Sequence, residues 1–178
     1  YAPLHVMLAV AVLHNWTPLV LVDEASPPAQ RRWVRGFGLV AFGIVPLLVA
    51  LGWGEALVHP SGLDPFQTGP LSTHHGAYLP PELQRLGSAD RLFTAIVVAQ
   101  CLHYAAVLLV LPRLIPRPAK GRSLWWDGTV VVASAGLLGL FGLDFVGARK
   151  LYGLASSVHA WIEVPVLLVC GLSVRPRA

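Results

Sequence analysis

The sequence predicts an all-α integral membrane protein: one domain of about five transmembrane helices with a long non-cytoplasmic loop. Of its 178 residues, 55% are hydrophobic and only 12% are charged, which leaves too few polar side chains to cover a soluble domain. Five largely apolar runs approach the ~20 residues that a helix needs to cross a bilayer. Because none alternates as a membrane β-barrel strand does, each is expected to be helical. The runs are residues 3–22, 36–57, 92–111, 124–146 and 151–173.

The first two runs lie on either side of a short basic segment. The run 3–22 carries no formal charge. Arg31, Arg32 and Arg35 follow it, as basic residues do at the cytoplasmic end of a span. The run 36–57 contains Pro46, which can kink a membrane helix.

The last three runs carry signals at their ends. Ser88 or Asp90 can cap the run 92–111, and Trp125 and Trp126 stand where the run 124–146 begins, as interfacial anchors do. In the run 151–173, Glu163 is the only formal charge well inside any of the five runs. This fifth run therefore needs an explanation beyond membrane insertion.

The basic residues predict the orientation of the bundle. With five spans, nine of the thirteen Lys and Arg residues share a side with the C-terminus, which the positive-inside rule places in the cytoplasm, with the inner membrane as the expected location. These charges lie at the ends of helices and form no basic face, which argues against nucleic acid as a partner. The four residues expected outside are Arg85, Arg91, Arg149 and Lys150.

The loop 58–91 then lies on the outer side. It is rich in proline and contains the adjacent pair His74 and His75 as well as His59. A connection of this length is often a lid or a binding loop. Adjacent histidines without a spaced partner are weak evidence for a metal, so we expect a solvated polar loop.

Three histidines share one depth in the predicted bundle. His14 and His103 each lie 11 residues after the start of their runs, and His159 lies 8 residues after the start of its run. At 1.5 Å per residue this places them ~12–17 Å below the outer ends, within about one helical turn of one another. His5 lies near the outer boundary, on the opposite side of its helix from His14, and does not belong to this group.

Each of these three runs also carries a polar stripe at that depth. At 100° per residue, Tyr152 and Ser156 share the face of His159 and Glu163, while Gln100 and Tyr104 share a face with His103. His14 shares a face with Thr17, and Pro18 leaves the His14 carbonyl without its usual backbone donor.

Glu163 decides how this cluster is interpreted. An unpaired ionisable group at the bilayer centre costs ~2.5–3.5 kcal/mol on insertion scales, so Glu163 must be protonated, paired with a histidinium or bound to a cation. His159 and Glu163 lie at i and i+4 and can reach one ion. With His14 and His103 the inventory is three imidazoles and a carboxylate, which suits iron, copper or zinc.

The function expected from this cluster is that of a membrane redox enzyme or electron-transfer subunit. If the chain is an enzyme, it is a metal-dependent oxidoreductase in which Glu163 is a ligand or proton relay. Tyr104 or Tyr152 would hydrogen-bond an oxygen species or an apolar substrate such as a quinone, and Gln100 and Ser156 would contact the bound group.

Two other classes fit the same residues. Histidines at equal depth on facing helices could hold haem or a chlorophyll-type tetrapyrrole in place of a bare ion. Alternatively, the polar residues only fix helix packing, and the chain is a scaffold subunit that binds other membrane subunits and the lipid bilayer. Metal content separates the scaffold from the other two classes.

Overall fold

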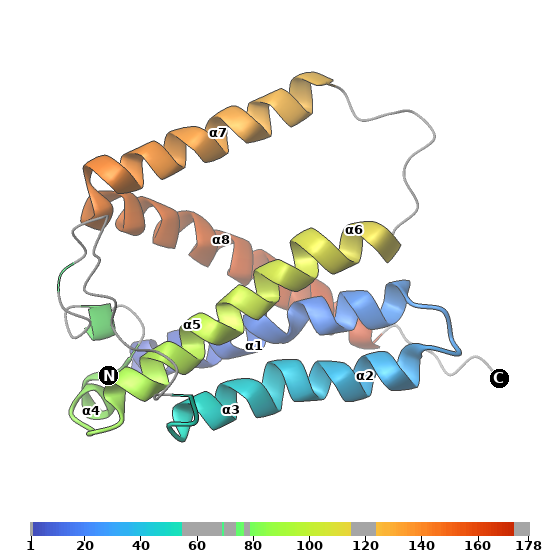
Figure 1. Cartoon of the computed structure of the whole chain (residues 1–178), viewed down its shortest axis with the longest axis horizontal. Coiled ribbons are helices and arrows are strands. Elements are labelled where there is room, and N and C mark those ends of the chain that lie inside the picture. Colours follow the sequence, from blue (N-terminus) through green and yellow to red (C-terminus); the bar gives the residue numbers. More distant parts are fainter. Residues whose placement is uncertain (1, 55–68, 70–73, 77–78, 115–123, 173–178) are drawn as a thin grey trace.

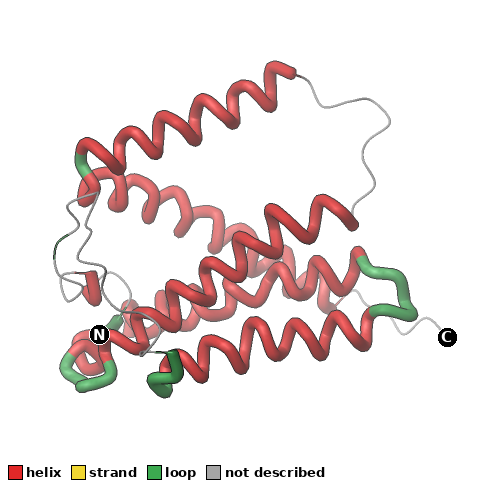
Figure 2. The backbone as a smooth tube through the Cα atoms, in the orientation of Figure 1, coloured by secondary structure: helices red, strands yellow, loops and turns green. Residues whose placement is uncertain are grey.

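The computed structural model describes residues 2–54, 69, 74–76, 79–114 and 124–172, and all regular structure in these ranges is helical (Figure 2). A long helical segment occupies each of the five predicted runs, which confirms the all-α fold. That all five cross a membrane stays a prediction. The segments begin with α1 (Ala2–Ala25) and end with α7 (Leu124–Leu143) and α8 (Phe145–Leu172).

The second and third segments are continuous helices interrupted by one π-helical turn each. The second consists of α2 (Arg31–Leu39), η1 (Val40–Ile44) and α3 (Val45–Ala50), and the third of α5 (Ala89–Ala105), η4 (Ala106–Val110) and α6 (Leu111–Leu114). Both π-helical turns end two residues before a proline, Pro46 and Pro112. A proline lacks the N–H for the carbonyl four residues earlier and clashes with it, and a widened turn relieves that clash.

Most helix ends differ from the predicted boundaries by several residues, and two of these differences have a clear local cause. The second segment ends at Ala50, because Gly52 and Gly54 adopt left-handed φ angles of 91° and 94°. The boundary near residue 57 was therefore too late. α8 begins at Phe145, six residues before the predicted start, because Asp144 accepts the backbone N–H of Gly147 at 2.9 Å as an N-cap.

α1 lies at the centre of the bundle and packs against both α5 and α8. These three helices run in the same direction, while α2–α3 and α7 run back (Figure 1). The short α4 (Pro81–Gln84) precedes α5, and α7 packs against α8. The fold thus brings together the three helices that carry His14, His103 and His159.

Two helical segments of the described chain are long and apolar enough to cross a membrane, Arg31–Ala50 and Ala89–Leu114. Val131–Leu143 is a shorter apolar stretch. Length and composition alone would also admit a buried core helix or a signal sequence. In the two long segments, however, only 6% and 17% of the apolar window is covered by the rest of the chain.

Candidate metal centre

One face of α8 presents the carboxylate and the imidazole that the sequence singled out. Nε2 of His159 lies 3.2 Å from Oε2 of Glu163, one helical turn away. The Glu163 side chain is 16% exposed, whereas that of His159 is 64% exposed. The carboxylate is therefore held between helices, and the imidazole stands at an open edge of the same site.

α1 completes this group with His14. Nδ1 of His14 lies 2.8 Å from the same Oε2 of Glu163. Thr17 Oγ1 lies 2.8 Å from the other carboxylate oxygen and 2.8 Å from the His14 carbonyl, which has no donor at Pro18. The expectation that this carbonyl is left for another donor is confirmed.

Thr17 can serve only one of these two acceptors at a time, because a hydroxyl has a single hydrogen. When Thr17 donates to the His14 carbonyl, Oε1 of Glu163 must carry a proton of its own or forgo this hydrogen bond. The hydroxyl therefore cannot by itself compensate a buried carboxylate charge.

Three buried polar atoms of the cluster have no hydrogen-bond partner within the described part of the chain. They are Nδ1 of His14, Nδ1 of His103 and Oε2 of Glu163. Nδ1 of His14 lies 2.8 Å from Oε2 of Glu163, and the tautomer of the ring decides whether a hydrogen stands between these two atoms. Leaving such an atom unsatisfied costs ~1–3 kcal/mol. A cation held between His14 and Glu163 would satisfy two of these atoms.

Two of the three separations within the group are close to those of atoms bound to one ion. His14, His159 and Glu163 each offer one ligand atom, and these atoms lie within 4.8 Å of one another. Bonds of ~2.0–2.1 Å to a metal place neighbouring ligand atoms roughly 2.9–3.4 Å apart, depending on the bond angle. The two distances to Oε2, 2.8 and 3.2 Å, lie at or close to this range.

His103 joins the cluster from α5 through its ring. Its imidazole is buried beside that of His14, with ring centroids 4.6 Å apart and planes tilted by 39°, while the His14 and His159 rings are 5.4 Å apart. The three histidines therefore meet in space. His103 does not belong to the three-residue ligand group, so its role as a ligand stays a prediction.

A cavity of about 370 Å³ adjoins the three histidines. α1, α5 and α8 form its walls, together with residues 76, 79 and 80 of the outer loop. It is lined by the other predicted contact residues, Gln100, Tyr104, Tyr152 and Ser156. Glu163 does not line it, so a molecule in the cavity would meet the imidazoles before the carboxylate.

The predicted contact residues differ in their present bonding. The Tyr104 ring packs edge-on against His103 at 5.4 Å, and the Tyr152 ring lies 6.3 Å from Phe141 of α7. The Ser156 hydroxyl donates to the carbonyl of Gly153 in its own helix at 3.1 Å. All four residues line the cavity and can contact a molecule bound there.

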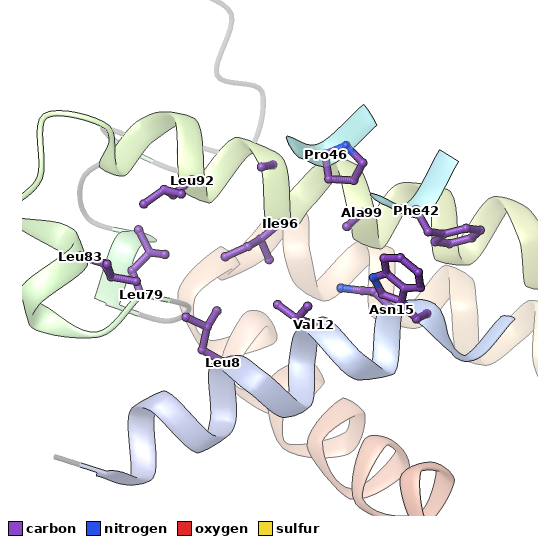
Figure 3. A pocket seen from close by; sticks show the side chains of 12 residues that line it. Leu8, Val12, Asn15, Phe42, Pro46, Leu79, Leu83, Leu92, Ile96 and Ala99 are labelled. Atoms are coloured by element: carbon purple, nitrogen blue, oxygen red, sulfur yellow. The ribbon is translucent and has the colours of Figure 1, made fainter. Parts of the chain in front are cut away.

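A second, apolar cavity of about 230 Å³ is lined by α1, α5 and the η1–α3 segment. Figure 3 shows Asn15 among the side chains of Val12, Ile96, Ala99 and Phe42 that line it. No ionisable side chain of the described chain lines this cavity, so it offers no comparable chemistry.

The outer-loop histidines are buried, which corrects the prediction of a solvated loop. His74 and His75 are 8% and 6% exposed. Nε2 of His75 lies 2.8 Å from a carboxylate oxygen of Asp90, and the Arg149 guanidinium contacts Nδ1 of His74. These contacts tie the loop to the first turns of α5 and α8. His59 lies outside the described residues.

Two contributors to this region were absent from the predicted site. The sequence placed Thr17 on the face of His14 but assigned it no role, although its position one turn after His14 and directly before Pro18 indicates one. Arg149 could have been found by continuing the α8 polar stripe outward, because it lies three residues before Tyr152. Its contact with His74 depends on the path of the loop, which periodicity does not reveal.

No family model, curated protein or solved structure matches this chain. The function must therefore be inferred from the chemistry of the site.

Proposed function

We propose that this chain is a multi-pass membrane protein that binds a transition-metal ion through His14, His159 and Glu163. The observation that carries the proposal is the convergence of two imidazole nitrogens, from α1 and α8, on one carboxylate oxygen: Nδ1 of His14 and Nε2 of His159 lie 2.8 and 3.2 Å from Oε2 of Glu163. A shared cation would satisfy these atoms and would compensate the carboxylate charge, which is costly within a membrane.

The outward-facing apolar surface supports a bilayer as the surroundings of the bundle. Water is a poor solvent for two long helical segments in which only 6% and 17% of the apolar window is buried. Trp33, Trp53 and Trp125 stand near helix ends with 73%, 70% and 87% exposure, as interfacial anchors do.

Cysteine labelling of oriented vesicles tests the five-span topology. After replacement of Cys101 and Cys170, single cysteines at the exposed positions Ala29 and Gly87 should react with an impermeant maleimide from opposite sides, Ala29 from the cytoplasm. Reaction of both from the same side would contradict the topology and the common depth of the histidines.

We further propose that the bound ion is redox-active, either iron or copper, and serves a membrane oxidoreductase or an electron-transfer subunit. Three protein ligands with His159 at an open edge would leave a coordination position for an oxygen species or a substrate. Tyr104 and Tyr152 would hydrogen-bond that molecule from the cavity wall. Zinc fits the same ligands but cannot change its oxidation state.

The ring geometry favours a bare ion over a tetrapyrrole. Two axial imidazoles must stand on opposite faces of a macrocycle, with their nitrogens directed at the metal from either side. The rings of His14 and His103 are only 4.6 Å apart and lie side by side, which leaves no room for a macrocycle between them.

Elemental analysis of the purified protein, combined with absorption and electron paramagnetic resonance spectra, tests the metal proposal. We expect about one iron or copper ion per chain and no Soret band. Glu163→Gln keeps the volume of the side chain but removes its charge, and should lower occupancy at least about tenfold. His5→Ala is the matched control, because His5 lies 3.8 Å from Glu82, away from the cluster. A folded, active and metal-free protein would leave only the scaffold function.

A further inference from the structure

The cavity beside the histidines has a cationic outer end. Arg149 and Lys150 line it in the first turns of α8, and none of the described residues that line it is acidic. The predicted topology places only four basic residues on the outer side, and two of them line this one cavity. Such a concentration is unexpected from membrane insertion alone, which places most basic residues in the cytoplasm.

The cavity extends from these cations to the candidate metal centre. Arg149 precedes His159 by ten residues of the same helix, a rise of ~15 Å. Both residues line the cavity, together with Leu8, Ile96 and Trp161 from its apolar walls. The pocket is therefore elongated, with a positive end and with imidazoles at the inner end. Between them, apolar side chains line it together with Tyr152 and Ser156.

Arg149 keeps the capacity to bind an anion despite its contact with His74. A guanidinium has five N–H donors in a planar fork, and His74 accepts through one nitrogen. Lys150 follows it and is exposed. Charge-assisted hydrogen bonds from these two groups suit a carboxylate or a phosphate.

We propose that this cavity binds an anionic amphiphile, with its head group on Arg149 and Lys150 and its apolar chain extended towards His159. This molecule is the substrate class of the proposed metal enzyme, and in that respect the inference rests on the proposed function. A long-chain carboxylate and a lipid phosphate share this chemistry, and the experiment distinguishes them.

Quenching of Trp161 fluorescence by brominated lipids measures this binding directly. The purified protein in detergent is titrated with dibromostearate, with its uncharged methyl ester and with a phosphatidic acid that carries brominated chains. The two anionic probes should quench saturably and bind at least about tenfold more tightly than the ester. The tighter of the two identifies the carboxylate or the phosphate as the preferred head group. Trp161→Phe should remove the saturable component.

The cationic end is tested with paired variants. Arg149→Gln/Lys150→Gln should weaken the anionic probes about tenfold or more and leave the ester unchanged. Arg85→Gln removes an outer, exposed charge that does not line the cavity and should have no effect. Lys150→Gln alone keeps the contact between His74 and Arg149, and should weaken anion binding about threefold if the double variant does not fold.

The outcomes separate this inference from the metal proposal. Equal affinity for acid and ester, or an unchanged affinity in a folded Arg149→Gln/Lys150→Gln protein, would overturn it whatever the metal content. Glu163→Gln should lose metal but keep charge-dependent quenching. If the wild-type protein contains no metal and still binds the anionic probes selectively, the metal proposal fails and the amphiphile site stands.

Discussion

The molecule contains two groups of histidines that differ in their surroundings. In the inner group, His14 and His159 converge on one carboxylate oxygen from two helices. In the outer pair, His74 and His75 contact different partners, an arginine of α8 and an aspartate of α5. Convergence on one point favours ion binding, whereas divergence towards two helices favours attachment of a loop.

The largest expected difference between the two groups is in metal binding. His14→Ala or His159→Ala removes a proposed ligand and should reduce occupancy more than about a hundredfold, since loss of a supporting residue alone costs 10–100-fold. His75→Ala also removes a buried imidazole and should leave occupancy unchanged. Elemental analysis of the three purified variants, each confirmed as helical by circular dichroism, measures this. An equal loss of metal in all three variants would show that the inner and outer histidines do not differ in metal binding.

His103 sharpens the comparison because it lies beside the inner group without belonging to its three ligands. If it supports His14 through ring packing, His103→Ala should weaken metal binding about 10–100-fold, less than the loss of His14. Competition with a chelator of known affinity measures the difference. A loss as large as that of His14→Ala would make His103 a fourth ligand, as the sequence predicts.

The inner group could be predicted because periodicity and span length determine the face and depth of a helical residue. Counting from the start of each run places His14, His103 and His159 at one depth. In the fold, the ring centroids of His103 and His159 lie 4.6 and 5.4 Å from that of His14. The same counting could not show which nitrogen points where. Whether His103 faces the carboxylate or the His14 ring depends on how α5 is rotated against α1.

The outer pair could not be predicted because its burial depends on the path of a loop. Nothing in the local sequence of His74 and His75 indicates that Asp90 and Arg149 will meet them. Two helix boundaries could not be predicted for a related reason. Gly52 follows the end of α3 with a left-handed backbone, and Asp144 caps the start of α8; the length of an apolar run indicates neither.

Thr17 offers a smaller effect within the inner group. Thr17→Val keeps the shape of the side chain but removes the hydroxyl that lies 2.8 Å from Glu163 Oε1 and from the His14 carbonyl. Metal affinity should fall about tenfold, as for other residues that orient a ligand. Thr129→Val is the matched control, because the Thr129 hydroxyl donates only to a carbonyl of its own helix, at 2.8 Å. Chelator competition on both variants tests this, and equal affinities would assign Thr17 to helix packing alone.

The smallest expected effect concerns the outer pair. His75 and Asp90 approach to 2.8 Å, but the Asp90 side chain is 68% exposed, so water screens the interaction and the coupling free energy should be only ~0.2–1 kcal/mol. A double-mutant cycle with His75→Gln and Asp90→Asn, followed by thermal unfolding in detergent, measures that coupling while metal content serves as the internal control. Because the contact is partly exposed, 1 M salt should reduce the coupling further. A coupling above about 2 kcal/mol, or a loss of metal in the double variant, would mean that loop attachment and the metal centre are linked and that the two histidine groups act as one site.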